Sequence, residues 1–156
     1  MPLDTIFGAI NLMAIAGWIA LLAGPLMPVL SQRIAAFLCP TLLALTYVAL
    51  IAAALSRLDS VAPGGEGPSP GFTTLDGVAA IFATREAVLT GWAHYLAFDL
   101  LVGAWEAREA RRLGIPHWLV VPCLVLTFVA GPAGFLVFLA LRWPYRRSSL
   151  RQVPAR

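Results

Sequence analysis

The stretch Gly91-Trp92-Ala93-His94-Tyr95-Leu96-Ala97-Phe98-Asp99-Leu100-Leu101-Val102-Gly103 reads as membrane-spanning, yet it carries a histidine and an aspartate. An ionisable group at mid-bilayer costs roughly 2.5–3.5 kcal/mol on insertion scales, and such groups usually face protein, a wet cavity or a ligand. The segment therefore predicts a transmembrane helix in which His94 and Asp99 are the first candidates for function.

The composition of the whole chain agrees with this reading. Hydrophobic residues make up 60% of the 156 positions and charged residues 12%, whereas soluble domains carry about 25% charged residues. The chain is too short for a membrane bundle together with a large soluble domain. We expect an all-α integral membrane protein with one four-span membrane domain over residues 1–142 and a basic cytoplasmic tail over residues 143–156.

The positions of the spans follow from apolar runs of about 20 residues. Four runs qualify, from about Thr5 to Ala23, Arg33 to Leu55, Arg85 to Trp105, and Pro116 to Leu141. Between the second and third runs, Ser56 to Gly71 is rich in glycine and proline and predicts a loop. Phe72 to Ala83 is compatible with a short interfacial helix.

The last run contains Gly131-Pro132-Ala133-Gly134. Proline has no amide hydrogen and clashes with the preceding turn, so this run is expected to bend or break its helix. The expected fold is therefore a four-helix membrane bundle with a Pro/Gly-broken fourth helix.

All 11 basic residues are arginines, and five of them lie between Arg142 and Arg156. We interpret this cluster as a positive-inside topology signal rather than a nucleic-acid site. With four spans, the arginine counts favour both termini in the cytoplasm. The bias toward Ala, Leu, Gly, Pro and Arg indicates a bacterial inner membrane. The N-terminus lacks a basic region, so the first span is expected to be a retained helix rather than a cleaved signal.

On a helical wheel, the third span has two polar rows. Glu86 and His94 belong to one row, and the other consists of Trp92, Tyr95, Asp99 and Glu106. His94 and Asp99 are about 140° apart at 100° per residue, so they cannot bond each other directly on a straight helix. They can flank a face that contains Gly91, Phe98 and Val102.

This pattern fits an elongated apolar ligand lying on the helix with a polar group on each side. The break at Gly131, Pro132 and Gly134 could line the same site. The alternative is structural: Asp99 could pair with an arginine, His94 could bond a backbone carbonyl, and the glycines could serve close helix packing. No metal site is expected, because the His, Cys, Asp and Glu residues lack the usual ligand spacings. No cofactor is expected either, whereas acid–base catalysis is chemically feasible.

The residues Trp92-Ala93-His94-Tyr95-Leu96-Ala97-Phe98-Asp99-Leu100, Leu113-Gly114-Ile115-Pro116 and Gly131-Pro132-Ala133-Gly134-Phe135-Leu136 together resemble the abscisic-acid-deficient-4-like membrane family. Its plant members are the neoxanthin synthases of plastids. The resemblance is best from about Leu75 to Arg142. It implies a small membrane protein that modifies, or holds, a carotenoid or another isoprenoid lipid.

The resemblance also implies a reaction of isomerase or oxidative type, like the conversion of an epoxide to an allenic alcohol. Such a reaction needs an acid at the epoxide oxygen and a base at a carbon-bound proton. We expect His94 and Asp99 to be that pair, with Glu86 in reserve, and Gly91, Trp92, Tyr95, Phe98, Gly131, Pro132 and Gly134 to line the substrate. Two other functions stay open, a non-catalytic carotenoid-binding or assembly protein and a small proton-coupled transporter. The expected partners are membrane lipids and the isoprenoid, and a homo-oligomer stays open.

Overall fold

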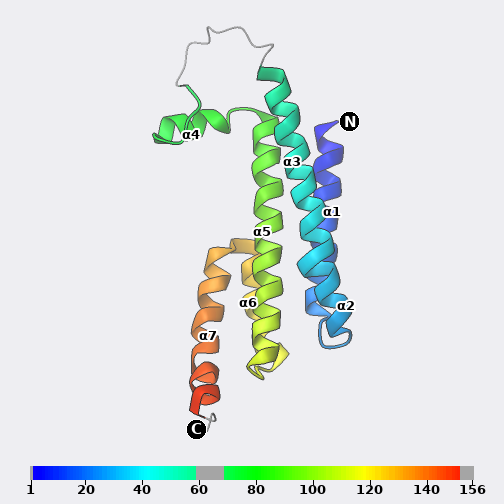
Figure 1. Ribbon diagram of the computed structural model, residues 1–156, viewed down its shortest axis with the longest axis vertical. Coiled ribbons are helices and arrows are strands. Elements are labelled where there is room, and N and C mark those ends of the chain that lie inside the picture. The colour runs from blue at the N-terminus through cyan, green and yellow to red at the C-terminus, as the bar shows by residue number, and fades with distance from the viewer. Residues whose placement is uncertain (1, 59–68, 152–156) are drawn as a thin grey trace.

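The computed structural model describes residues 2–58 and 69–151, and every regular element in these ranges is helical (Figure 1). The elements are α1 (Leu3–Leu22), α2 (Pro28–Arg33), the π-helical turn η1 (Ile34–Leu38), α3 (Cys39–Leu58), α4 (Leu75–Ile81), α5 (Arg85–Arg112), α6 (His117–Ala130) and α7 (Pro132–Arg151). Helix α7 continues past residue 142, where we expected the tail to begin.

Three helical segments are long and apolar enough to cross a membrane, namely Leu3–Leu22, Pro28–Ser56 and Arg85–Arg112. They confirm the first three expected spans and the character of an integral membrane protein. The second span begins five residues earlier than expected because Pro28 sits in the first turn of α2, where a proline loses no helical hydrogen bond. The expected interfacial helix exists as α4. Residues 59–68 of the expected loop lie outside the described residues.

The expected fourth span is not a single helix. The chain reverses between α6 and α7, which pack against each other as a hairpin beside α5 (Figure 1). Helix α6 has 14 residues, and at 1.5 Å per residue it is about 21 Å long, too short for a hydrocarbon core of about 30 Å. The four-helix bundle is thus corrected to three long helices and a hairpin that reaches part of the way along them.

Gly131 makes the reversal. Its φ of 29° and ψ of −92° end α6, and a side chain would be strained in this left-handed region. Pro132 then begins α7, with its ring already at a helical φ. The Gly-Pro pair therefore ends one helix and starts the next, at the place where we expected the helix to bend or break.

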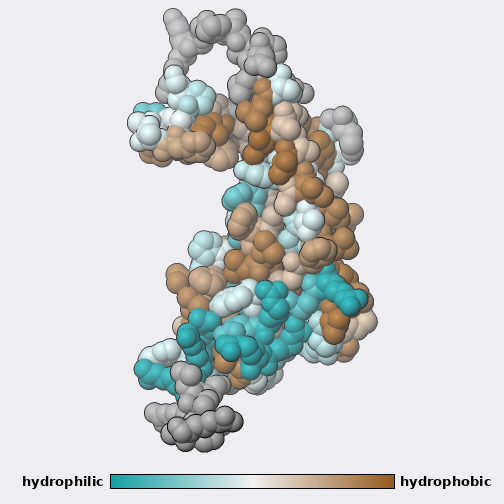
Figure 2. All heavy atoms as spheres, in the orientation of Figure 1, coloured by the Kyte–Doolittle hydropathy of each residue, from teal (hydrophilic) through white to brown (hydrophobic). Residues whose placement is uncertain are grey.

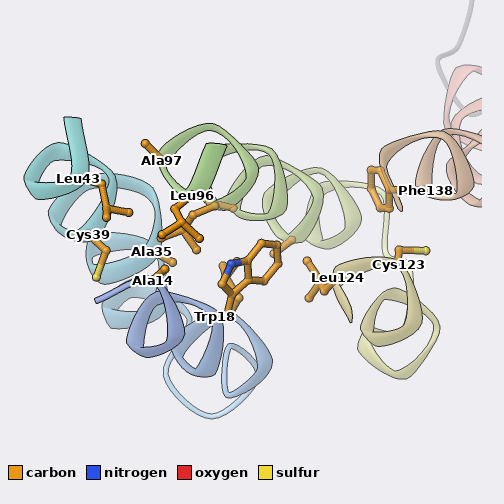
Figure 3. Close-up of a cluster of buried hydrophobic side chains, with 14 of the residues drawn as sticks. Ala14, Trp18, Ala35, Cys39, Leu43, Leu96, Ala97, Cys123, Leu124 and Phe138 are labelled. Carbon is orange, nitrogen blue, oxygen red and sulfur yellow. The ribbon is translucent and has the colours of Figure 1, made fainter. Parts of the chain in front are cut away.

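Small residues let the long helices approach closely, as in many membrane bundles. A Cβ on Gly103 of α5 would lie 2.6 Å from the Trp18 ring of α1, so the indole lies directly on the α5 backbone. Figure 3 shows this indole between the helices, with Leu96 of α5 and Leu124 of α6 nearby. The hairpin is thereby part of the same apolar core as the three spans.

The two ends of the described chain lie far apart. The N-terminal end of α1 and the C-terminal end of α7 lie at opposite ends of the long axis (Figure 1). Four complete spans would have put both ends on one side. Hydrophilic residues gather at the end where α5 stops and α7 ends (Figure 2).

Candidate functional site

One polar stripe of α5 faces α1 and the hairpin. It consists of Trp92, Tyr95, Asp99 and Glu106. The rings of Trp92 and Tyr95 stack with centroids 5.2 Å apart. The indole nitrogen of Trp92 donates a 3.2 Å hydrogen bond to Oδ1 of Asn11 on α1. The Tyr95 hydroxyl donates to the carbonyl of Val129, near the end of α6, across 3.4 Å. These contacts connect all three elements at one level of the bundle.

The carboxyl group of Asp99 lies directly against the turn of the hairpin. A Cβ on Gly131 would be 2.7 Å from Oδ1 and 2.9 Å from Oδ2 of Asp99, so only a glycine leaves room for the carboxyl there. Oδ2 is buried and has no hydrogen-bond partner among the residues that the structure describes. The Tyr95 hydroxyl lies near the same carboxyl group, one helical turn away. Asp99 lies midway along α5, and therefore deep in the membrane if α5 spans it.

A second carboxyl group lies two turns further along the same stripe. Glu106 is fully buried, with 0% exposure. Its two oxygens lie 3.0 and 3.2 Å from the hydroxyl of Thr127 on α6, which donates to them. A Cβ on Gly134 of α7 would overlap the backbone nitrogen of Thr127. The close approach at Gly134 thus holds α7 against the point where α6 bonds α5.

An apolar groove along α5 consists of two neighbouring cavities that share Trp92 in their walls. The outer part has a volume of about 520 Å³ and lies between the starts of α1 and α5; its wall includes Leu3, Phe7, Val88, Leu89 and Trp92. The inner part, about 220 Å³, is lined by Asn11, Ala14, Ile15, Trp92, Tyr95, Leu96, Phe128 and Val129. Trp92 belongs to both parts. Tyr95 lines the inner part and lies one helical turn before Asp99, which itself lines neither part.

His94 lies on a different face of α5. Its ring stacks on Phe98 with centroids 4.6 Å apart and contacts Tyr47 of α3 at 5.4 Å. Both His94 and Phe98 are exposed at the outside of the bundle. The structure therefore does not bring His94 and Asp99 to one site, whereas we had expected them to flank one ligand face as an acid–base pair.

Of the remaining predicted site residues, some lie at the groove or the hairpin and others lie elsewhere. Glu86 is in the first turn of α5, more than three turns from Asp99, and its backbone carbonyl accepts a hydrogen bond from Thr90. Gly91 does not face the groove but contacts the ring of Phe82, which a Cβ would approach to 2.7 Å. Pro132 is exposed. Of the predicted lining residues, Trp92 and Tyr95 line the groove, and Gly131 and Gly134 shape the hairpin beside it.

Three polar residues that the sequence analysis did not assign to the ligand site belong to this region: Asn11, Glu106 and Thr127. Glu106 could have been found, because it lies seven residues after Asp99 and so falls on the same helical stripe. Asn11 and Thr127 are uncharged and lie on other helices, so no local spacing connects them to α5. Within residues 2–58 and 69–151, no three His, Cys, Asp or Glu side chains cluster as a metal site would require.

Comparison with protein families gives one match. The model described as ABA DEFICIENT 4-like matches residues 5–138, which include all three spans and most of the hairpin. Comparisons with curated proteins and with solved structures give no match.

Proposed function

We propose that this chain, which belongs to the ABA DEFICIENT 4-like family, binds a carotenoid or a related isoprenoid inside the membrane and isomerises it. The observation that carries the proposal is the buried and unpartnered oxygen of the Asp99 carboxyl group, one helical turn from Tyr95, which lines the inner part of the aromatic groove. A buried polar atom without a partner costs free energy. A ligand with a hydroxyl group at its end would supply the missing donor.

The groove suits an elongated apolar molecule. It follows α5 from Arg85 to Leu96, a length of about 17 Å at 1.5 Å per residue. The aromatic rings of Phe7, Trp92 and Tyr95 lie in its wall, and flat rings of this kind favour contact with a conjugated chain. An isoprenoid could therefore lie along α5 with its ring end at Tyr95 and its chain toward the start of α1.

The chemistry would be a proton exchange that leaves the atom count of the ligand unchanged. The Tyr95 hydroxyl gives a proton to the epoxide oxygen as the carbon–oxygen bond breaks. A base removes a proton from carbon, and the new double bond forms from the released electron pair. We assign the base to Asp99, because the carboxyl group also lies within reach of Tyr95 and can return the proton to it.

This assignment replaces the pair expected from the sequence. His94 is on another face of α5, where its ring contacts those of Tyr47 and Phe98. Glu86 is too far along α5 to reach a ligand group held at Asp99. The proposed acid–base pair is therefore Tyr95 and Asp99.

The function is tested by expressing the chain in a carotenoid-producing bacterial host and separating the extracted pigments by chromatography. An isomerase converts part of the pigment to a product of unchanged mass and altered retention. If the pigment that co-purifies with the protein is unchanged and no new product accumulates, the protein only binds carotenoid. If no pigment co-purifies and none is converted, the proposal is wrong.

We also propose an orientation in a bacterial inner membrane. The arginine-rich end of the bundle collects residues from α2, α5 and α7, namely Arg33, Arg108, Arg111, Arg112, Arg142, Arg146 and Arg147. The opposite end has the Arg85–Asp4 ion pair, at 2.6 Å. The positive-inside rule then places the C-terminus in the cytoplasm and the N-terminus outside.

A further inference from the structure

A second cavity lies at the arginine-rich end, well away from the aromatic groove. It has a volume of about 310 Å³ and is bounded by the turn between α1 and α2 and by the turn between α5 and α6. Its lining residues are Leu21, Gly24, Pro25, Ser31, Gln32, Ala107, Arg111, Gly114, Ile115 and His117. We propose that this cavity binds a phosphate group, carried by an anionic lipid or free in solution.

Two polar atoms at the cavity are buried without partners. The hydroxyl of Ser31, a residue only 4% exposed, has no hydrogen-bond partner among the described residues, and neither has the amide nitrogen of Gln32. Buried polar groups in native proteins are almost always paired. Two unpaired groups beside one cavity indicate that something in the cavity pairs with them.

The neighbouring contacts hold these groups in position. Arg108 donates to Oε1 of Gln32 across 3.0 Å, which leaves the amide nitrogen of Gln32 as the free donor. Arg111 donates one hydrogen bond to the carbonyl of Pro28 across 3.1 Å, and its guanidinium group has further N–H donors. His117 bonds the carbonyl of Leu22 across 3.1 Å. These bonds fix both turns around the cavity.

The lining of this cavity is positively charged and offers hydrogen-bond donors, so it favours an anion. Arg111 carries a positive charge, and Ser31 and Gln32 can donate hydrogen bonds, whereas no Asp or Glu lines the cavity. An oxyanion with several acceptor oxygens matches this set, and arginine is well suited to phosphate. The cavity lies at the end that the positive-inside rule assigns to the cytoplasm, where anionic lipid headgroups attract basic residues. The site is chemically independent of the carotenoid proposal.

The test measures the thermal unfolding of the detergent-purified full chain during titration with inorganic phosphate and, separately, with a short-chain phosphatidylglycerol. Sodium chloride of equal ionic strength and a short-chain phosphatidylcholine are the reference additives. A ligand that binds only the folded state raises the midpoint saturably. We expect such a rise with at least one of the two phosphate compounds. A response to both means that phosphate alone suffices, and a response to the lipid alone means that the headgroup is needed.

Three variants decide whether the response comes from the cavity. Ser31→Ala removes an unpartnered hydroxyl, so the midpoint without ligand should not fall, while the apparent affinity should weaken about tenfold, as for a lost bond to a charged group. Arg111→Gln should weaken the affinity at least as much. Arg33→Gln removes the same charge from the same end but does not line this cavity, and it should bind as the unmodified chain does.

The proposal is overturned if neither phosphate compound gives a saturable rise. It is also overturned if Arg33→Gln weakens binding as much as Arg111→Gln does, because the effect would then come from general surface charge. Unchanged affinity in Ser31→Ala would contradict it as well.

Discussion

Replacing Thr127 by valine should destabilise the protein through one identifiable contact, the bond between its hydroxyl and Glu106. That hydroxyl donates at 3.0 and 3.2 Å to a carboxyl group with 0% exposure. Valine has nearly the same shape, so the variant removes the donor and leaves a buried carboxyl group without it. Interhelical hydrogen bonds in membranes average about 0.6 kcal/mol and reach about 1.7, and a buried polar group that loses its partner adds a desolvation cost. We expect a loss of about 1–2 kcal/mol.

The control is the same substitution at Thr46, whose hydroxyl bonds only the carbonyl of Leu42 one turn back on its own helix, at 2.9 Å. Thr46→Val should cost less than about 0.5 kcal/mol, as for residues away from buried networks. Both variants are measured by reversible unfolding in mixed micelles, followed by tryptophan fluorescence.

The double variant Glu106→Leu, Thr127→Val completes a cycle. Replacing both partners by apolar groups can be nearly neutral, so the double variant should be more stable than Thr127→Val alone, with a coupling of about 1 kcal/mol. Additive losses, or equal losses for Thr127→Val and Thr46→Val, would refute the view that this contact fixes the hairpin to α5.

Two further predictions concern the hairpin and the orientation. Gly131→Ala should lower the free energy of unfolding by about 2–4 kcal/mol, because the residue has a left-handed φ and its Cβ would lie 2.7 Å from Asp99. Gly8→Ala is the control, since nothing lies within 4 Å of its Cβ, and it should not lower the free energy of unfolding in the same assay. Equal effects of the two variants would contradict the described turn. An impermeant thiol reagent should label Asp4→Cys in intact cells, against a low background from the buried Cys39 and Cys123. A green fluorescent protein fused to the C-terminus should fluoresce, because that end is assigned to the cytoplasm. Labelling of Asp4→Cys only after lysis would contradict the proposed orientation.

The three spans could be predicted from sequence because length and hydropathy suffice for them. The hairpin could not, because an apolar run from Pro116 to Leu141 is long enough to cross, and Gly131-Pro132 is compatible with a kink as well as a reversal. The choice between a kink and a reversal is decided by the φ of Gly131 and by the room that Asp99 requires beside it. Both depend on packing against α5. The orientation was counted over four spans, and it stays a prediction.

The site residues on α5 could be predicted from their spacing, but the residues that contact them from other helices could not. The spacing of Trp92, Tyr95, Asp99 and Glu106 correctly placed them on one stripe, and the wheel separated His94 from Asp99. The sequence could not show which face of α5 meets α1 and the hairpin. That depends on the contacts of Trp92 with Asn11 and of Glu106 with Thr127, and neither Asn11 nor Thr127 belongs to a periodic polar pattern. Phe98 was expected in the ligand face and instead stacks on His94 at the outside.

The most direct test of the account compares Asp99→Asn with His94→Ala for pigment conversion in the carotenoid-producing host. Both variants remove an ionisable group from the same helix, within five positions of each other, but only Asp99 lies against the hairpin turn, on the stripe of α5 whose Tyr95 lines the groove. We expect Asp99→Asn to abolish the new product at an unchanged level of membrane-inserted protein, and His94→Ala to retain it. Full conversion by Asp99→Asn, or its loss in His94→Ala alone, would contradict the assignment of the site to the hairpin face.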